Sequence, residues 1–372
     1  MSVRILIGDV RSRLADLPDE SVHCVVTSPP YFGLRDYGTA SWEGGDPACD
    51  HVEKNARNDV SAEDLARRAA QSSAGTGDGS KVKPMQFKGA CNKCGAIRAD
   101  KQIGLEDTPA AFVAVMVEVF REVRRVLRND GTLWLNLGDS YAVRAQSRSD
   151  DYIARTGGNT GLNAKNIRAH ERTGYGDAKQ KDLLGIPWRV AFALQADGWY
   201  LRQDIIWSKP NPMPESVTDR CTKAHEYMFL MSKSARYHYD ADAIRDEPTG
   251  RTDGVRFSSV PDINGKAHAN GFQPDGLKGA NRRSVWTVAT QPFSEAHFAT
   301  FPPALIEPCI LAGCPKGGTV LDPFFGAGTT GLVADRLGRD CIGIELNPEY
   351  TEIARKRIHG DSTLFSAVTV AA

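Results

Sequence analysis

Apolar and polar positions repeat with two different periods along the chain, and each change of period marks a predicted element. Residues 3–7 and 22–27 are short runs rich in β-branched side chains, which is typical of buried strands. Between 109 and 127 apolar residues recur at helical spacing behind Thr108 as N-cap and Pro109 in the first turn, which predicts a helix. The same criteria predict a strand at 132–137, a helix at 183–196, a strand at 200–207 and an apolar run at 227–231.

The most regular block lies near the carboxyl end of the chain. Strands alternate with helices there, which indicates a mainly parallel α/β sheet. The predicted order is a helix at 304–312, a strand at 319–321, a glycine turn, a helix at 330–337, a strand at 341–345 and a helix at 348–358. Three polar stretches without apolar periodicity, 39–105, 141–181 and 242–283, are predicted to be loops or insertions.

Composition excludes several classes of protein. The 372 residues are 41% hydrophobic and 25% charged, as in ordinary soluble domains. No apolar run approaches the roughly 18–20 residues of a membrane span, and the first residues lack the layout of a signal peptide. Eight cysteines are too few for a disulfide framework. We therefore expect a cytoplasmic protein with no membrane partner.

The formal net charge is zero, but the charge is unevenly distributed. Residues 141–181 hold eight basic against four acidic side chains, and residues 248–285 hold six against three. Basic, glycine-rich loops suit phosphate contacts with a nucleic acid, although solvated loops without a partner remain an alternative.

A glycine-rich turn at 322–331 (DPFFGAGTTG) leaves a predicted strand and enters a predicted helix. Its tail matches G-x-G-x-x-G, whose glycines let the backbone approach a nucleotide-like ligand at a helix N-terminus. Glu345 ends the next strand, where an acidic side chain is placed to bind ribose hydroxyls. This motif alone does not separate a dinucleotide from S-adenosylmethionine.

A second motif, TSPPY at 27–31, directly follows the strand at 22–27. It therefore lies at the carboxyl end of a strand, where open α/β sheets bind ligands. Pro29 and Pro30 fix φ and remove two backbone donors, so the preceding carbonyls point outward from a rigid loop. The hydroxyl of Ser28, a fixed carbonyl and the ring of Tyr31 form a receptor for a flat, amino-bearing ring. An ordinary Pro-Pro turn is the alternative.

Together, TSPPY and the later DPFFGAGTT resemble the DNA amino-methyltransferases, which methylate N4 of cytosine or N6 of adenine with S-adenosylmethionine. The order of the motifs is that of a permuted group of this family. Gly8-Asp9, 205–214, His225-Glu226 and 301–312 add to the resemblance. It implies a Rossmann-like S-adenosylmethionine-dependent methyltransferase fold with a mainly parallel seven-stranded sheet, circularly permuted motif order and loop insertions.

The resemblance also implies roles for individual residues. Ser28 and the Pro29 carbonyl would accept hydrogen bonds from the target amine, and Tyr31 would stack on the flipped base. Asp322 and the glycine turn would hold the methionine portion of the cofactor, Glu345 its ribose, and Asp9 its adenine. The implied catalytic residues are Ser28, Pro29, Pro30 and Tyr31, and the implied cofactor-binding residues are Asp9, Asp322, Pro323, Phe324, Phe325, Gly326, Gly328, Thr329, Thr330 and Glu345.

The two motifs leave the target base open, because both chemistries occur in the family. Asp at the first position of the tetrad usually accompanies adenine, and Ser often accompanies cytosine, so Ser28 favours N4-cytosine over N6-adenine. An exocyclic amine shares its lone pair with the ring, and two acceptors around its N–H groups favour the pyramidal nitrogen that attacks the methyl group. No covalent intermediate is needed.

Partners and organisation follow from the same resemblance. It implies double-stranded DNA with one base flipped out, leaves a homodimer open, and suits bacterial or phage restriction–modification. Three segments would form the methyltransferase domain: 1–38 with TSPPY, 106–240, and 286–360 with the cofactor site. An insertion (39–105), a target-recognition region (241–285) and a tail (361–372) would complete the chain.

Two cysteine-containing pairs flank the insertion. Cys49-x-His51 and Cys91-x-x-Cys94 offer four ligands suited to tetrahedral structural zinc. The long gap between the pairs is unlike that of common zinc fingers, and free thiols or a redox pair are the alternatives.

Four rival functions share features of this pattern. An NAD-dependent oxidoreductase would use the glycine turn and Glu345 but leave TSPPY without a role, and a methyltransferase of RNA or protein glutamine would use both motifs. A C5-cytosine methyltransferase needs a cysteine nucleophile, and Pro308-Cys309 falls inside a predicted apolar helix. A DNA-binding module without catalysis is the fourth.

Overall fold

The structure is a computed structural model that describes residues 1–33, 41–51, 90–91, 93–99, 102–142, 178–246, 279–291, 301–361 and 367–371. Most of the basic stretches 141–181 and 248–285, and with them most of the expected target-recognition region, lie outside these residues. Within the described portion of the chain no helix is long and apolar enough to cross a membrane.

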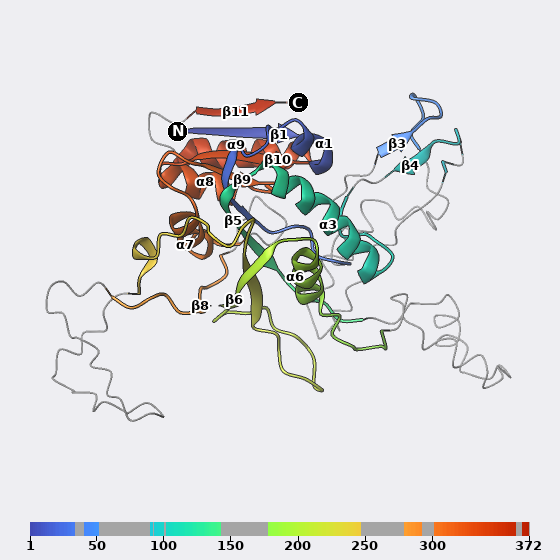
Figure 1. The fold of residues 1–372 in the computed structure, drawn as a ribbon. Helices are drawn as coiled ribbons and strands as arrows, with labels where there is room; N and C mark the ends of the chain where they lie inside the picture. Colours follow the sequence, from blue (N-terminus) through green and yellow to red (C-terminus); the bar gives the residue numbers. More distant parts are fainter. Residues whose placement is uncertain are drawn as a thin grey trace, which may run out of the picture.

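One large sheet forms the centre of the molecule, with strand order β11-β1-β10-β9-β2-β5-β7-β6-β8 (Figure 1). Only β7 runs antiparallel to its neighbours β5 and β6. The strands are β1 (Ser2–Ile7), β2 (Val22–Thr27), β5 (Leu127–Leu137), β6 (Tyr200–Ser208), β7 (His225–Ser232), β8 (Val285–Thr287), β9 (Thr319–Asp322), β10 (Asp340–Glu345) and β11 (Ala367–Ala371). The predicted seven-stranded, mainly parallel sheet is confirmed from β1 to β6, and the short strands β11 and β8 extend its two edges.

Helices cover both faces of this sheet (Figure 1). α1 (Val10–Ala15), α3 (Pro109–Val126) and α6 (Ile186–Ala196) pack on one face, and α7 (Pro303–Gly313), α8 (Thr329–Arg336) and α9 (Pro348–Asp361) on the other. The strands supply alternate residues to the two cores, as the period of two requires: Leu133 and Leu135 of β5 face α3 and α6, and Trp134 faces α7.

Two smaller features were not predicted. The six-residue helix α1 begins directly after Asp9, whose carboxylate accepts hydrogen bonds from the backbone N–H groups of Arg11 and Ser12. A separate two-stranded antiparallel sheet, β3 (Ser41–Glu43) with β4 (Ile97–Ala99), lies at the two ends of the insertion.

The predicted helix at 183–196 begins at Ile186, because Gly185 has a left-handed backbone with φ of 67°.

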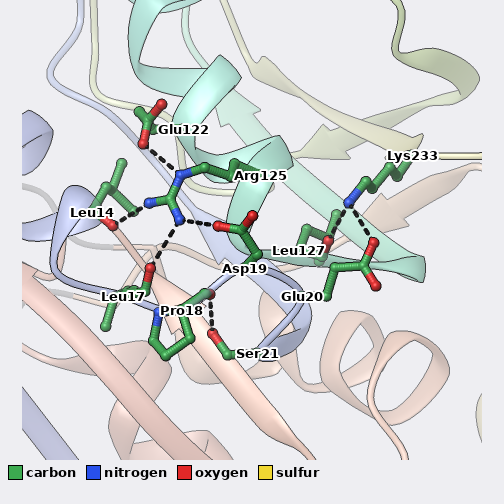
Figure 2. A network of polar contacts seen from close by, with 10 residues as sticks. All are labelled: Leu14, Leu17, Pro18, Asp19, Glu20, Ser21, Glu122, Arg125, Leu127 and Lys233. Atoms are coloured by element: carbon green, nitrogen blue, oxygen red, sulfur yellow. Dashed lines mark hydrogen bonds and ion pairs between the residues drawn. The ribbon is translucent and has the colours of Figure 1, made fainter.

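At the amino end of β2 a partly buried network ties α1 to α3 (Figure 2). The guanidinium of Arg125 donates to the backbone carbonyls of Leu14 at 2.7 Å and Leu17 at 2.9 Å. Nearby, Lys233 donates to the carbonyl of Leu127 at 2.8 Å. These bonds satisfy backbone carbonyls at the edge of the sheet opposite to TSPPY, so the polar side chains at this edge stabilise the fold.

Candidate active site

TSPPY leaves β2 at the carboxyl edge of the sheet, and three other strands meet it there. β5 and β6 end at this edge, and the antiparallel β7 begins at it. Because the strands run in these directions, residues far apart in sequence come together around one loop. The ring of Tyr31 lies so close to Gly138 after β5 that a Cβ there would stand 2.5 Å from it. Only glycine leaves room for the ring in this position.

The hydroxyl of Tyr31 is the centre of a hydrogen-bonded chain. Ser28 Oγ donates to it at 3.4 Å, and it donates to Glu226 Oε2 at 2.7 Å. Asn136 Oδ1 stands at 3.1 Å as a second acceptor, and its amide is oriented by a bond from Nδ2 to the Tyr227 carbonyl. Since the Ser28 proton is directed at Tyr31, the lone pairs of Ser28 remain available to accept a hydrogen bond from a ligand.

Glu226 is held in place by a second contact. Lys209 Nζ lies 2.5 Å from Glu226 Oε1, and both side chains are more than 80% shielded from solvent. The ammonium also lies 4.2 Å from the centre of the Trp207 ring. A shielded ion pair with both oxygens of the carboxylate engaged fixes the acceptor of the Tyr31 hydroxyl.

The TSPPY loop and the glycine turn share one buried carboxylate. Asp322 is 1% exposed, and it accepts hydrogen bonds from Thr27 Oγ1 and Thr330 Oγ1, each at 2.6 Å. The backbone N–H of Phe324 donates to it at 3.0 Å. Burial raises the pKa of Asp322 to about 6, against the lowering effect of these donors. Thr27, the first residue of TSPPY, is thereby joined to the end of β9 and the start of α8.

The glycine turn itself lies between β9 and α8 and faces the end of β10. Gly326 has φ of 52°, and nothing lies within 4 Å of the point where a Cβ would stand, so open space adjoins the turn. Its N–H donates to Glu345 Oε2 at 2.7 Å, and the Asn347 N–H donates to Oε1 at 2.9 Å. Burial raises the pKa of Glu345 to about 7. Ile7 of β1 pairs with Glu345 of β10, so Asp9, two residues after Ile7, lies at the same carboxyl edge of the sheet.

The Cys/His pairs of the insertion come together beside the small sheet of β3 and β4. The four ligand atoms of Cys49, His51, Cys91 and Cys94 lie within 4.8 Å of one another. Cys49 Sγ and Cys91 Sγ are 3.8 Å apart, and Cys94 Sγ is 3.3 Å from His51 Nδ1. The alternative nucleophile Cys309 lies inside α7, fully buried, and burial raises the pKa of its thiol far above the ordinary range. It has no access to a substrate.

Most predicted site residues therefore lie along one edge, but the network around them was not predicted. The TSPPY loop, the glycine turn, Glu345 and Asp9 share the carboxyl edge of the sheet. Asn136, Lys209 and Glu226 had no assigned role, although Lys209 and Glu226 fall in segments that carried the resemblance. Their polar side chains at the ends of apolar strands were the available signal.

A parallel sheet with one reversed strand, helices on both of its faces and two coupled motifs at its carboxyl edge define a Rossmann-like methyltransferase. The family model described as DNA methylase, for N6 and N4 methyltransferases, matches residues 22–356. The Type II methyltransferases M.Cfr9I of Citrobacter freundii and M.SmaI of Serratia marcescens are each 41% identical over 96% of this chain, and the matches cover 87% and 91% of those proteins.

This chain belongs to the N6/N4 DNA methylase family and is a DNA methyltransferase. Solved structures share its fold. PvuII DNA methyltransferase, which is cytosine-N4-specific, has a TM-score of 0.52 at 16% identity, covering 99% of this chain and 95% of that one. TTHA0409 of Thermus thermophilus, described as a putative DNA modification methylase and solved in complex with S-adenosyl-L-methionine, has a TM-score of 0.50 at 20% identity, with 99% of both chains covered.

Proposed function

We propose that this enzyme transfers a methyl group from S-adenosyl-L-methionine to N4 of a cytosine flipped out of double-stranded DNA, at a specific sequence. The observation that carries the proposal is the neutral hydroxyl of Ser28, which directs its proton to Tyr31 and keeps its lone pairs for a target amine. Family resemblance associates serine at this position with cytosine, and the PvuII enzyme with the same fold is cytosine-N4-specific.

The chain of bonds from Ser28 through Tyr31 to Glu226 supports this chemistry. Ser28 donates its proton to Tyr31, and Tyr31 donates its proton to the Glu226 carboxylate. Because these bonds polarise one another, the oxygen of Ser28 becomes a stronger acceptor than that of an isolated hydroxyl. Ser28 Oγ and the Pro29 carbonyl would accept the two N–H groups of the amine and favour its pyramidal form. Tyr31, packed against Gly138, would present its ring to the flipped base.

The glycine turn fits an S-adenosyl-L-methionine site. The open space beside Gly326 and the half-buried carboxylate of Glu345 suit the close approach of a ligand with ribose hydroxyls. When bound, this cofactor supplies an electrophilic methyl group on a sulfonium. Glu345 would accept the ribose hydroxyls, Asp9 would lie toward the adenine, and the turn from Asp322 to Thr330 would hold the methionine portion.

One analysis of modified DNA tests the proposal. The gene is expressed in a host without N4-methylcytosine, and the host DNA is digested to nucleosides for mass spectrometry and sequenced for methylated positions. N4-methylcytosine in one sequence context is expected, and a Tyr31→Ala variant should produce none. N6-methyladenine would assign the other amine, and restriction–modification would be supported if the methylated sequence became resistant to a nuclease that cuts it.

Glu345 makes cofactor affinity dependent on pH. Ribose hydroxyls donate to the ionised carboxylate, but burial raises the pKa of Glu345 to about 7, so below that pH binding must first release a proton. The dissociation constant should rise about tenfold for each pH unit below 7 and level off above pH 8. Calorimetric titration from pH 5.5 to 8.5 measures this. Glu345→Gln should bind more weakly and lose most of the slope, and equal wild-type affinity at pH 6 and 8 would contradict the role of Glu345.

The Cys/His cluster is proposed to hold one structural zinc ion. A tetrahedral ion with Zn–S bonds of about 2.3 Å separates two sulfur ligands by about 3.8 Å. Cys49 and Cys91 have this separation. The N–H of Lys93 donates to Cys91 Sγ at 3.4 Å, as backbone donors do toward a thiolate. Four protein ligands fill the tetrahedral site, so the ion would join the two ends of the insertion and leave no position for water.

Elemental analysis of purified protein tests the zinc site. We expect about one equivalent of zinc in the wild type and less than about a tenth in Cys91→Ser, because three ligands bind structural zinc poorly. Cys221→Ser is the matched control, since Cys221 is exposed and outside the cluster, and it should keep the full equivalent. A wild type without zinc after growth in zinc-supplemented medium would remove the site.

A further inference from the structure

Two residues before β7, and three before the Glu226 that binds Tyr31, lies a shielded ammonium with no hydrogen-bond partner among the described residues. Lys223 stands two residues before β7, and its Nζ has no exposed surface and no hydrogen-bond acceptor among the residues that the structure describes. Burial lowers the pKa of this ammonium, while the negative charges of Asp139 and Glu226 oppose the shift. A buried donor that stays unpaired is unfavourable for folding, so its retention points to a ligand.

The nearby carboxylates are held by other donors. Asp139 Oδ1 accepts the backbone N–H groups of Ser140 and Ile186, each at 2.9 Å. Glu226 accepts Lys209 on one oxygen and Tyr31 on the other. Lys223 therefore interacts electrostatically with both carboxylates without a hydrogen bond to either, and its three N–H groups remain available to an acceptor on a ligand.

We propose that Lys223 determines specificity by donating a hydrogen bond to the ring nitrogen next to the target amine of the flipped base, which is N3 in cytosine. This inference rests on the proposed function only in requiring an amino-bearing base as the target. Ser28 and Pro29 occupy the amine, and the ring nitrogen is the neighbouring atom on the same edge of the base. Because the Nζ of Lys223 is shielded from solvent, it suits a base edge that enters the protein better than a phosphate, which stays outside with the backbone.

This bond selects among the four bases. Cytosine and adenine carry an unprotonated ring nitrogen beside the amine, at N3 and N1, and both accept a hydrogen bond. Thymine and guanine carry an N–H at the corresponding position, and it would face the Lys223 ammonium donor to donor. A mispaired donor in a buried site is rejected strongly. Lys223 would thus exclude bases that the hydroxyl of Ser28 alone does not.

The bond should act on binding more than on the chemical step. A hydrogen bond from the cation to the ring nitrogen stabilises the bound base. The cation also draws electron density from the amine, so it does not assist attack by the amine lone pair. Loss of the bond should therefore raise KM for DNA and leave kcat nearly unchanged. A residue that acted only by holding the fold together would not produce this division.

The inference is tested by steady-state kinetics of Lys223→Met on unmethylated duplexes that contain the sequence at which the enzyme acts. We expect KM for DNA to rise about tenfold with kcat within about twofold, and Tm to rise by about 2 °C because a buried charge is removed. Wild type should lose about tenfold in kcat/KM when the target is 3-deazacytosine, which lacks the N3 acceptor, whereas Lys223→Met should lose less than about twofold. If the target proves to be adenine, 1-deazaadenine replaces this analogue, and the inference is tested even though the N4 assignment fails.

Lys233→Met is the matched control. Lys233 is also shielded, but it lies at the opposite edge of the sheet and donates to the Leu127 carbonyl (Figure 2). This variant should have a lower Tm and an unchanged KM. The inference is overturned if Lys223→Met has wild-type kinetics, if its Tm falls with its activity, or if the analogue costs both proteins the same factor. A fall of about one in the slope of log KM against log salt would assign Lys223 to a phosphate instead.

Discussion

Replacement of Ser28 by alanine is expected to lower kcat for methylation of DNA by about 100-fold or more, with cofactor affinity within about twofold of wild type. The hydroxyl is the acceptor that becomes stronger through Tyr31 and Glu226, and the charge that develops on the attacking amine needs it most in the transition state. The glycine turn and Glu345 are separate from Ser28, so the cofactor site stays intact. Single-turnover kinetics with labelled cofactor and calorimetric titration measure the two quantities.

Two further variants separate this effect from general damage. Ser21→Ala changes a serine just before the amino end of the same strand, where its hydroxyl donates to the Pro18 carbonyl at 2.7 Å, and its activity should be unchanged (Figure 2). Tyr31→Phe keeps the ring but breaks the link to Glu226, and an intermediate loss of about tenfold is expected. If Ser28→Ala turned over within about threefold of wild type, Ser28 would have no role in catalysis.

The sequence was sufficient for the central sheet because its strands are apolar runs that lie next to clear turn or helix signals. The elements it missed depend on partners elsewhere in the chain. β11 is a five-residue segment that becomes a strand by pairing with β1, almost the whole chain away. α1 is too short to show a helical period, and its start is fixed by the Asp9 cap. Such elements have no local pattern strong enough to identify them.

The site shows the same division. TSPPY and the glycine turn are local motifs, and their chemistry could be predicted from neighbouring residues. The Tyr31–Glu226 bond joins residues 195 positions apart, and the Thr27–Asp322 bond joins residues 295 apart. No spacing rule connects such pairs, so these contacts depend on the order of strands in the sheet. The structure contains the hydrogen bonds of Asp322 with Thr27 and Thr330. A contact between Asp322 and the cofactor stays a prediction.

Asp322→Ala is expected to reduce the free energy of unfolding by about 3–5 kcal/mol at pH 7.5, because it leaves two buried hydroxyls without their acceptor. Activity should fall with it, since Thr27 and the start of α8 lose their common anchor. Asp322→Asn keeps the shape and an acceptor and removes the cost of burying a charge, so a loss of only about 1 kcal/mol is expected. Urea unfolding of the three proteins measures these differences, and equal urea midpoints for wild type and Asp322→Ala would contradict the proposed anchor.

The pH dependence of unfolding gives an independent check on Asp322. Burial raises its pKa in the folded protein to about 6, above the ordinary 3.8, so the folded state binds the proton more tightly than the unfolded chain. Its contribution to stability is therefore fully present below about pH 4 and is lost as the pH rises through about 6. Glu345 acts in the same direction up to about pH 7, so Asp322→Asn should remove only the lower portion of this dependence. A Thr27→Val change should cost less in the Asp322→Ala background than in wild type, because the hydroxyl that it removes has already lost its partner.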